Sequence, residues 1–425
     1  MPIGLPAQPL TEASTSSSLL RQRDFQLLWS GQVVSVLGSR VTGVALPLLV
    51  LDLTGSPARA GLAEFAYLLP IVAFTLPAGA VSDRWNRKRV MIAADAARGL
   101  AIGSLALALL AHRPAFAQIL AVAFVEGSGF TFFTVAQQAA LRQLVPAELL
   151  PAAAAQNQGR EFGALLVGQP LGGFLFSVGR VVPWAFDAIS YLVSLTTLAL
   201  IRRPLEESRG PADRHLGREI QEGLRFLWRQ PFLRASSILV TGSDFVLNAL
   251  FLGVIVIARQ HGATPTLIGT MVAFLGVGGL LGSLVAPALA STLTLRQTVA
   301  LTMVAPALLL PLLLLVTNPL LLGLVYGAMF VAHPTWSAVV GTYRLLITPD
   351  RLQGRVQSVT TLLSVAPLPL GALAVGLLLE ELGSTTTLLI LTTVMGAVAV
   401  GAVFSRGVRE APPARPPLPG PELGS

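Results

Sequence analysis

The sequence has no cysteine and unusually few charged residues. Without cysteine, disulfides and thiolate metal sites are excluded. Charged residues make up 12% of the chain, whereas a soluble domain carries roughly 25%. The four histidines are scattered and form no metal-binding set, and no phosphate-binding loop is present. We therefore expect no metal site, no direct use of ATP and no enzyme of a known type.

The sequence is rich instead in apolar residues, which make up 53% of the chain and give a mean hydropathy of +0.71. They form long runs separated by short polar joints. A run of about 20 apolar residues crosses the hydrocarbon core, and a lipid-exposed backbone must satisfy its own hydrogen bonds, so such runs are helical. The sequence predicts an all-α membrane protein with about twelve spans, at 25–51, 58–80, 90–111, 116–140, 150–178, 183–201, 235–258, 265–290, 297–316, 319–341, 355–380 and 385–405.

The net charge of +8 could suggest a nucleic-acid partner, but the distribution of charge favours a membrane topology. Arginine and lysine gather in alternate joints, at 80–89, 202–234 and 342–355, while the intervening joints carry single arginines or none. Short basic loops stay in the cytoplasm. The pattern predicts a multi-pass protein of the bacterial inner (cell) membrane with both termini in the cytoplasm and no nucleic-acid partner.

The spans group into two sets of six. The region between them has apolar residues at helical spacing, which predicts an amphipathic helix on the membrane surface. It serves either as a plain connector or as a regulatory, partner-binding element. The sequence thus predicts a cytoplasmic segment at 1–24, a six-helix bundle at 25–201, a linker at 202–234, a second bundle at 235–405 and a disordered, Pro- and Gly-rich tail at 406–425.

Weak internal matches, all in one order, relate the two sets. Gly38-Ser39-Arg40 aligns with Gly242-Ser243-Asp244, and Ser56-Pro57 aligns with Thr264-Pro265. Each set begins on the same side of the membrane, so the two are parallel repeats. Parallel halves with a binding site at their interface are typical of the major facilitator architecture, in which one half rocks against the other.

The joint after the second span carries a recognisable motif. It resembles the major facilitator signature G-x-x-x-D-R-x-G-R-[KR], with Asn86 where the family usually has glycine. Asp83 can pair with the basic residues or face a helix N-terminus, and Gly79 allows close helix approach. This predicts a latch that closes the cytoplasmic side in one conformation, the alternative being a loop that only sets orientation. The motif residues are Gly79, Asp83, Arg84, Arg87, Lys88 and Arg89.

Further motifs resemble the third drug:proton antiporter family, which includes macrolide exporters and a siderophore exporter. They are Phe25-Gln26-Leu27-Leu28-Trp29, Leu53-Thr54-Gly55-Ser56-Pro57 and Asp95 with Arg98. In the fifth span, Gly168, Pro170, Gly172 and Gly173 are similar to the antiporter motif G-P-x-x-G-G, with the proline one place late. The resemblance implies export driven by the proton gradient without another cofactor, and close packing of helix 5 on helix 8.

Ionisable residues inside the spans are the main candidates for function, because a charge in the membrane is costly unless it is paired or used. We expect Arg40 and Asp244 to face each other across a central cavity, either as a structural ion pair or as part of the site. Glu126 lies in the middle of the fourth span. A carboxyl group in an apolar cavity can carry a proton near neutral pH or bind a cation, so Glu126 and Asp244 are the proton or cation candidates. The family often has an arginine three residues before Glu126, where this chain has Ala123.

Other residues are weaker candidates. Glu64 and Asp187 are expected toward the outer ends of their helices, in contact with solvent, and Arg160 and Glu161 in the cytoplasmic mouth. His333 could titrate. Aromatic residues that could line the cavity include Phe130 and Trp336.

The sequence as a whole favours a monomeric secondary transporter that exports small amphiphilic or hydrophobic compounds against protons across the lipid bilayer. Export of a native metabolite such as a siderophore, or lipid flipping, remains an alternative within transport, as does import. A non-transporting membrane receptor is a remote alternative, which would predict a closed core without substrate flux.

Overall fold

The computed structural model describes residues 19–205 and 216–412, and these residues form helices and no strands. The N-terminal half consists of α1 (Arg23–Thr54), α2 (Pro57–Arg84), α3 (Arg87–Leu110), α4 (Phe116–Leu144), α5 (Leu150–Val178) and α6 (Val182–Leu200). The C-terminal half consists of α8 (Pro231–Gln260), α9 (Pro265–Thr292), α10 (Leu295–Leu309), α11 (Pro319–Ala328), α12 (His333–Trp336), α13 (Thr342–Ile347), α14 (Asp350–Val365) and α15 (Pro367–Phe404). Between and after the halves lie α7 (Leu216–Arg229) and α16 (Arg406–Arg409).

Eleven segments of the described chain are long and apolar enough to cross a membrane. The last of them, Asp350–Phe404, has 55 residues. At 1.5 Å per residue this segment is roughly 80 Å long, more than twice the ~30 Å of the hydrocarbon core. Gly383, with φ of 74°, breaks it into two parts. The all-α membrane fold is confirmed, and the count of twelve spans stays a prediction that this break supports.

The turns before the second and eighth predicted spans have the same construction. Gly55 ends α1 with φ of 67°, and the Ser56 hydroxyl then accepts a hydrogen bond from the Arg59 N–H of α2 at 3.1 Å. In the other half, Gly262 has φ of 76° and the Thr264 hydroxyl caps α9. Each helix then starts with proline, which suits the first turn because its N–H would be unpaired there.

The spans predicted at 297–316 and 319–341 are less regular than expected. The first ends in a 3-10 turn, Leu310–Leu314, and the second is divided into α11, α12 and a π-helical turn, Ser337–Gly341. Irregular backbone is tolerated at membrane depth where it lines a cavity. His333 and Trp336, on α12, do line one.

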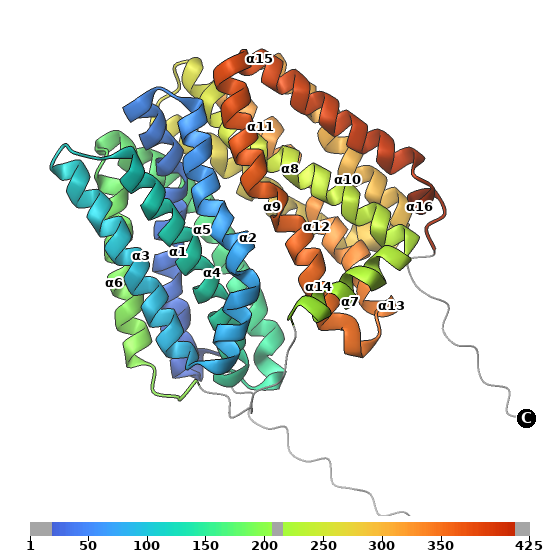
Figure 1. The fold of residues 1–425 in the computed structure, drawn as a ribbon, viewed down its shortest axis with the longest axis horizontal. Helices are drawn as coiled ribbons and strands as arrows, with labels where there is room; N and C mark the ends of the chain where they lie inside the picture. Colours follow the sequence, from blue (N-terminus) through green and yellow to red (C-terminus); the bar gives the residue numbers. More distant parts are fainter. Residues whose placement is uncertain (1–18, 206–215, 413–425) are drawn as a thin grey trace, which may run out of the picture.

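The two halves share an apolar core at one end of the bundle only. We call the end where α1 and α8 begin the inner end, and the opposite end the outer end. At the outer end, buried residues of both halves, such as Leu49 of α1 and Val254 of α8, form one cluster. At the inner end each half has a cluster of its own. The halves accordingly meet at the top of Figure 1 and diverge toward the bottom.

Glycines bring the halves into backbone contact at two crossings. A Cβ on Gly61 of α2 would lie 3.0 Å from the Gly376 Cα of α15. A Cβ on Gly173 of α5 would lie 3.1 Å from the Gly269 Cα of α9. Small residues permit this approach. Both crossings lie toward the outer end, so the inner ends are free to separate.

The predicted linker helix exists as α7, but it packs on the protein. Gly223 lies against the backbone of Arg355 at α14, Glu222 forms an ion pair with Arg355, and Leu227 is fully buried. The amphipathic helix is therefore present and packs on the C-terminal half, and its place at the membrane surface stays a prediction.

The start of the predicted disordered tail is also ordered, since α16 packs through Gly407 on the first turn of α8. Residues 413–425 of that tail, 1–18 of the predicted N-terminal segment and 206–215 of the linker lie outside the described residues.

Candidate functional site

A cavity of about 810 Å³ lies between the halves. It extends from mid-depth, at Leu46 of α1, to the inner part of the C-terminal half, at Arg344 and Gln357. Its size suits a drug-sized ligand. Its lining includes the predicted candidates Arg40, Glu64, Glu126, Asp244, His333 and Trp336.

Polar contacts between the halves close the outer end. Asp52, at the end of α1, accepts a hydrogen bond from Arg259 of α8 at 3.3 Å, and Arg259 also donates to the Leu48 carbonyl at 3.3 Å. Glu380 of α15 accepts hydrogen bonds from the Ser56 hydroxyl and, at 2.8 Å, from the Ala58 N–H at the start of α2. With the inner ends apart, this conformation opens the cavity to the inner side.

Glu126 is held in a buried ion pair inside the N-terminal half. Arg98 of α3 donates to one Glu126 oxygen through Nε at 3.2 Å and Nη2 at 3.0 Å, and the Tyr191 hydroxyl of α6 donates to the same oxygen at 3.0 Å. The side chains of Arg98 and Glu126 are 5% and 8% exposed. Arg98 thus supplies the cation that the sequence lacks at Ala123. The other Glu126 oxygen is buried without a hydrogen bond.

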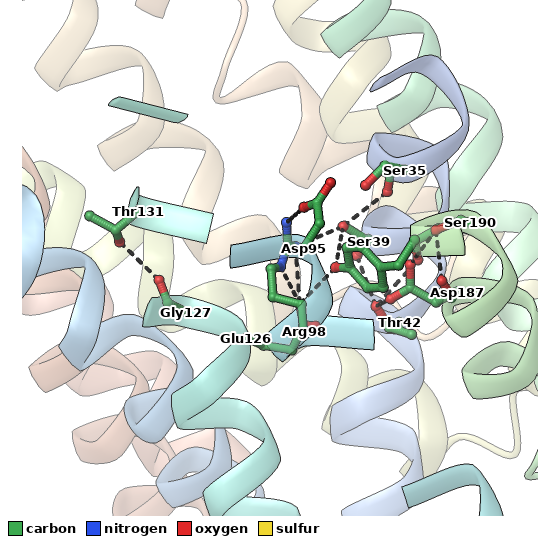
Figure 2. A network of polar contacts seen from close by, with 12 residues as sticks. Ser35, Ser39, Thr42, Asp95, Arg98, Glu126, Gly127, Thr131, Asp187 and Ser190 are labelled. Carbon is green, nitrogen blue, oxygen red and sulfur yellow. Dashed lines mark hydrogen bonds and ion pairs between the residues drawn. The ribbon is translucent and has the colours of Figure 1, made fainter. Parts of the chain in front are cut away.

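Further polar side chains surround this pair, as Figure 2 shows. Arg98 also donates to the Ser39 hydroxyl at 3.0 Å, and its Nη1 lies 3.8 Å from Asp95. Asp187 accepts hydrogen bonds from Thr42 at 3.0 Å and Ser190 at 2.9 Å and is fully buried. The expectation that Asp187 meets solvent is wrong, because α1 and α6 pack closely around it.

The ion-pair partner of Arg40 lies in the N-terminal half, to which Arg40 itself belongs. It forms an ion pair with Glu161 of α5 at 3.2 Å, and the other Glu161 oxygen accepts from Arg160 at 2.9 Å. The described structure therefore contains no Arg40–Asp244 ion pair, although both residues line the cavity. Glu161 lies about two helical turns before Gly168 on α5. Gly168 packs on the Arg40 side chain, so α5 brings the Glu161 carboxylate within reach of Arg40.

Asp244 and Glu64 line the cavity without partners. Among the described residues, neither side chain has a hydrogen bond or an ion pair. Glu64 lies beside the cavity instead of at a solvated helix end, because α2 crosses α15 at Gly61 and turns this face inward. Phe130 does not line the cavity, and its ring centroid lies 5.9 Å from the Arg98 guanidinium carbon.

The basic motif after α2 contacts its own half. Arg87 is buried and donates to the Ser82 and Ala139 carbonyls at 3.4 Å, and Lys88 donates to the Ala199 carbonyl at 2.9 Å. The Asn86 side chain caps α3, which is a use that glycine could not provide. A Cβ on Gly79 would meet nothing within 4 Å. The expected close approach there is absent in this conformation, because the halves diverge at the inner end.

The antiporter-type motif holds α5 between the halves. Gly168 and Gly172 pack on α1, and Gly173 contacts α9, the eighth predicted span. Gln169, which stands in the usual place of the proline, is 4% exposed and lines the cavity. Its Oε1 is buried without a hydrogen-bond partner.

Sequence reasoning missed several residues of the site. Arg98 is indicated only by the family resemblance, and Tyr191, Gln169 and Asn248 are not among the predicted site residues. The rare charge in the third span was a usable signal for Arg98. The neutral residues Tyr191, Gln169 and Asn248 had no such signal, because many other uncharged polar side chains in the spans face neighbouring helices or lipid.

Comparison with known proteins agrees with this architecture. The profile of the transmembrane secretion effector family matches residues 14–415. The chain is 29% identical to the multidrug efflux pump Tap of Mycolicibacterium fortuitum, and the alignment covers 88% of this chain and 93% of that one. It is 26% identical to macrolide efflux protein A of Streptococcus pyogenes, and that alignment covers 91% of this chain and 96% of the relative. A bacterial homologue of the human lysosomal transporter Spinster, solved in an inward-facing and unoccupied conformation, superposes with a TM-score of 0.66 at 15% identity, covering 91% of this chain and 96% of that one.

Proposed function

The chain belongs to the transmembrane secretion effector family of major facilitator transporters, and from this premise we propose that it exports small amphiphilic or hydrophobic compounds against protons. It is a multi-pass transporter and not an enzyme. The inner-open cavity between two halves carries the proposal, because it presents carboxylates on an otherwise largely apolar wall. The names of the efflux relatives support export. We place the transporter in the bacterial cell membrane as a monomer, with the inner end and both termini in the cytoplasm, as the basic joints indicate.

In this proposal Glu126 carries the proton. The ionised carboxylate holds Arg98 through two hydrogen bonds, and the Glu126–Tyr191 contact ties α4 to α6. Protonation removes the charge that holds the Arg98 guanidinium, which then turns toward Asp95 and Ser39. The helices of the N-terminal half repack as a result. A proton coupled in this way biases alternating access, because a ligand that favours one state shifts the equilibrium between states.

The test is substrate-driven proton movement in proteoliposomes. For each of several amphiphilic compounds, a concentration gradient is imposed across the proteoliposome membrane. The internal pH is then followed with and without an uncoupler. Glu126→Gln should abolish coupled proton movement while substrate exchange at equal pH persists. Glu148→Gln, on an exposed carboxyl outside the cavity, should behave as wild type. Unchanged coupling in Glu126→Gln would show that the proton travels elsewhere.

A further inference from the structure

One face of α8 narrows the class of substrate. We propose that Asp244 and Asn248 form a subsite for a protonated amine, so that the exported compounds are amphiphilic amines carrying N–H donors. This inference rests on the proposed export function and assigns its substrate class. It follows from which charged groups in and around the cavity already have partners and which acceptors have no donor.

The cations beside the cavity already have partners. Arg40 is paired with Glu161, Arg98 is paired with Glu126, and Arg344 at the inner mouth donates to Gln357 at 2.7 Å. Asp244, in contrast, has no hydrogen bond or ion pair within the described part of the chain. A carboxylate in a partly apolar cavity gains most from an incoming cation, because water there solvates it less well than bulk solvent does.

Asn248 adds a second acceptor beside this charge. It follows Asp244 by four residues on α8, so both side chains lie on one face of the helix, and both line the cavity. The Asn248 Oδ1 is buried and has no hydrogen-bond partner. Gln169 of α5 lines the same cavity from the other half, and its buried Oε1 also lacks a donor. An unpaired buried acceptor is costly, and a ligand with N–H groups would satisfy it.

The rest of the cavity wall indicates the chemistry of the part of the ligand that does not carry the amine. Leu247 and Phe251 continue the cavity face of α8, and Phe330 and Trp336 lie on the same wall of the C-terminal half. These side chains suit an apolar or aromatic body. A protonated primary, secondary or tertiary amine on such a body fits both parts. An anionic compound would face an unneutralised carboxylate.

Three ligands with one aromatic skeleton test the subsite. The first carries a primary amine, the second a trimethylammonium group, and the third an N-acetylated amine. Binding to the purified full-length protein is measured by calorimetry. The wild type should prefer the primary amine, because only this ligand has both charge and several N–H donors. Equal affinity for the amine and the N-acetyl compound would overturn the proposal.

Two variants separate charge from hydrogen bonding. Asp244→Asn should weaken the amine about tenfold to a hundredfold, the loss expected for a hydrogen bond to a charged group. It should also weaken the trimethylammonium compound, which loses the opposite charge, and leave the N-acetyl compound unchanged. Asn248→Leu should weaken the two ligands that have N–H donors, the amine most, and leave the trimethylammonium compound unchanged. Asp244→Glu keeps the charge and should retain amine binding, which excludes misfolding as the cause. Asp350→Asn, on an exposed carboxyl at the start of α14, is the matched control.

The outcomes distinguish the subsite from the proposed function. If the binding pattern holds but proteoliposomes show no proton-coupled export, the proposed function is wrong and the subsite stands. If export is coupled but Asp244→Asn weakens all three ligands alike, or none of them, the subsite is wrong and the proposed function stands.

Discussion

The contact between Asp52 and Arg259 predicts a measurable shift between conformations when it is removed. Asp52 lies on α1 and Arg259 on α8, so their ion pair at 3.3 Å ties the halves at the outer end. Arg259→Gln removes this pair and weakens the hydrogen bond to the Leu48 carbonyl. Both side chains are partly exposed, so the closed outer end loses at most about 1 kcal/mol of stabilisation, which is the upper end of the range for an exposed pair. This corresponds to a roughly fivefold larger outward-open population.

A single cysteine reports this population. The chain has no cysteine of its own, so Leu46→Cys, in the outer part of the cavity lining, is the only labelling site. An impermeant maleimide added outside right-side-out vesicles reacts only when the outer end opens. Arg259→Gln should raise the labelling rate about fivefold, in proportion to that population.

Arg180 provides the matched control. It also pairs with Asp52, but both residues belong to the N-terminal half. Arg180→Gln therefore removes a comparable exposed ion pair without untying the halves, and the labelling rate should not change. The reasoning fails if the two variants raise the rate equally, or if Arg259→Gln leaves it unchanged.

Two further predictions concern the same outer end. Gly173→Leu should lower the melting temperature of the purified protein, because overpacking a backbone crossing costs about 1–3 kcal/mol. Gly163→Ala should not lower it, because a Cβ at Gly163 meets open space. Equal melting temperatures for the two variants would refute the close crossing at Gly173. The Glu380 carboxylate accepts hydrogen bonds from the Ser56 hydroxyl and the Ala58 N–H across the closed outer end. Glu380→Gln weakens both contacts and should therefore increase quenching, by external iodide, of a fluorophore on Leu46→Cys. Unchanged quenching would show that this contact does not hold the outer end closed.

The spans could be predicted from sequence because the bilayer permits few solutions. A long apolar run must be helical, so α1 was expected at 25–51 and lies at Arg23–Thr54. The break-up of the span predicted at 319–341 was not foreseen. Apolarity alone does not distinguish a straight helix from one that bends around a cavity.

The composition of the candidate site was partly predictable, and its pairing was not. Sequence selects Arg40, Glu126 and Asp244 because charges are rare in the spans. Their partners depend on helix rotation, which hydropathy does not specify when all faces of a helix are apolar. Arg98 and Glu126 are 28 residues apart on adjacent helices, and a rotation of either helix by a third of a turn would separate them.

The charges differ in whether their pairs stay within a half or cross between halves. Arg40–Glu161 and Arg98–Glu126 lie within the N-terminal half, so they move with it and need not break when the halves rock. A mid-depth pair between Arg40 and Asp244 would have tied the halves together in a poorly solvated place, where breaking an ion pair is expensive. The Asp52–Arg259 pair, which joins the halves at the outer end, is partly exposed, so breaking it costs little free energy. Because Arg40 is paired within its own half, Asp244 is left free to receive a cation from the substrate.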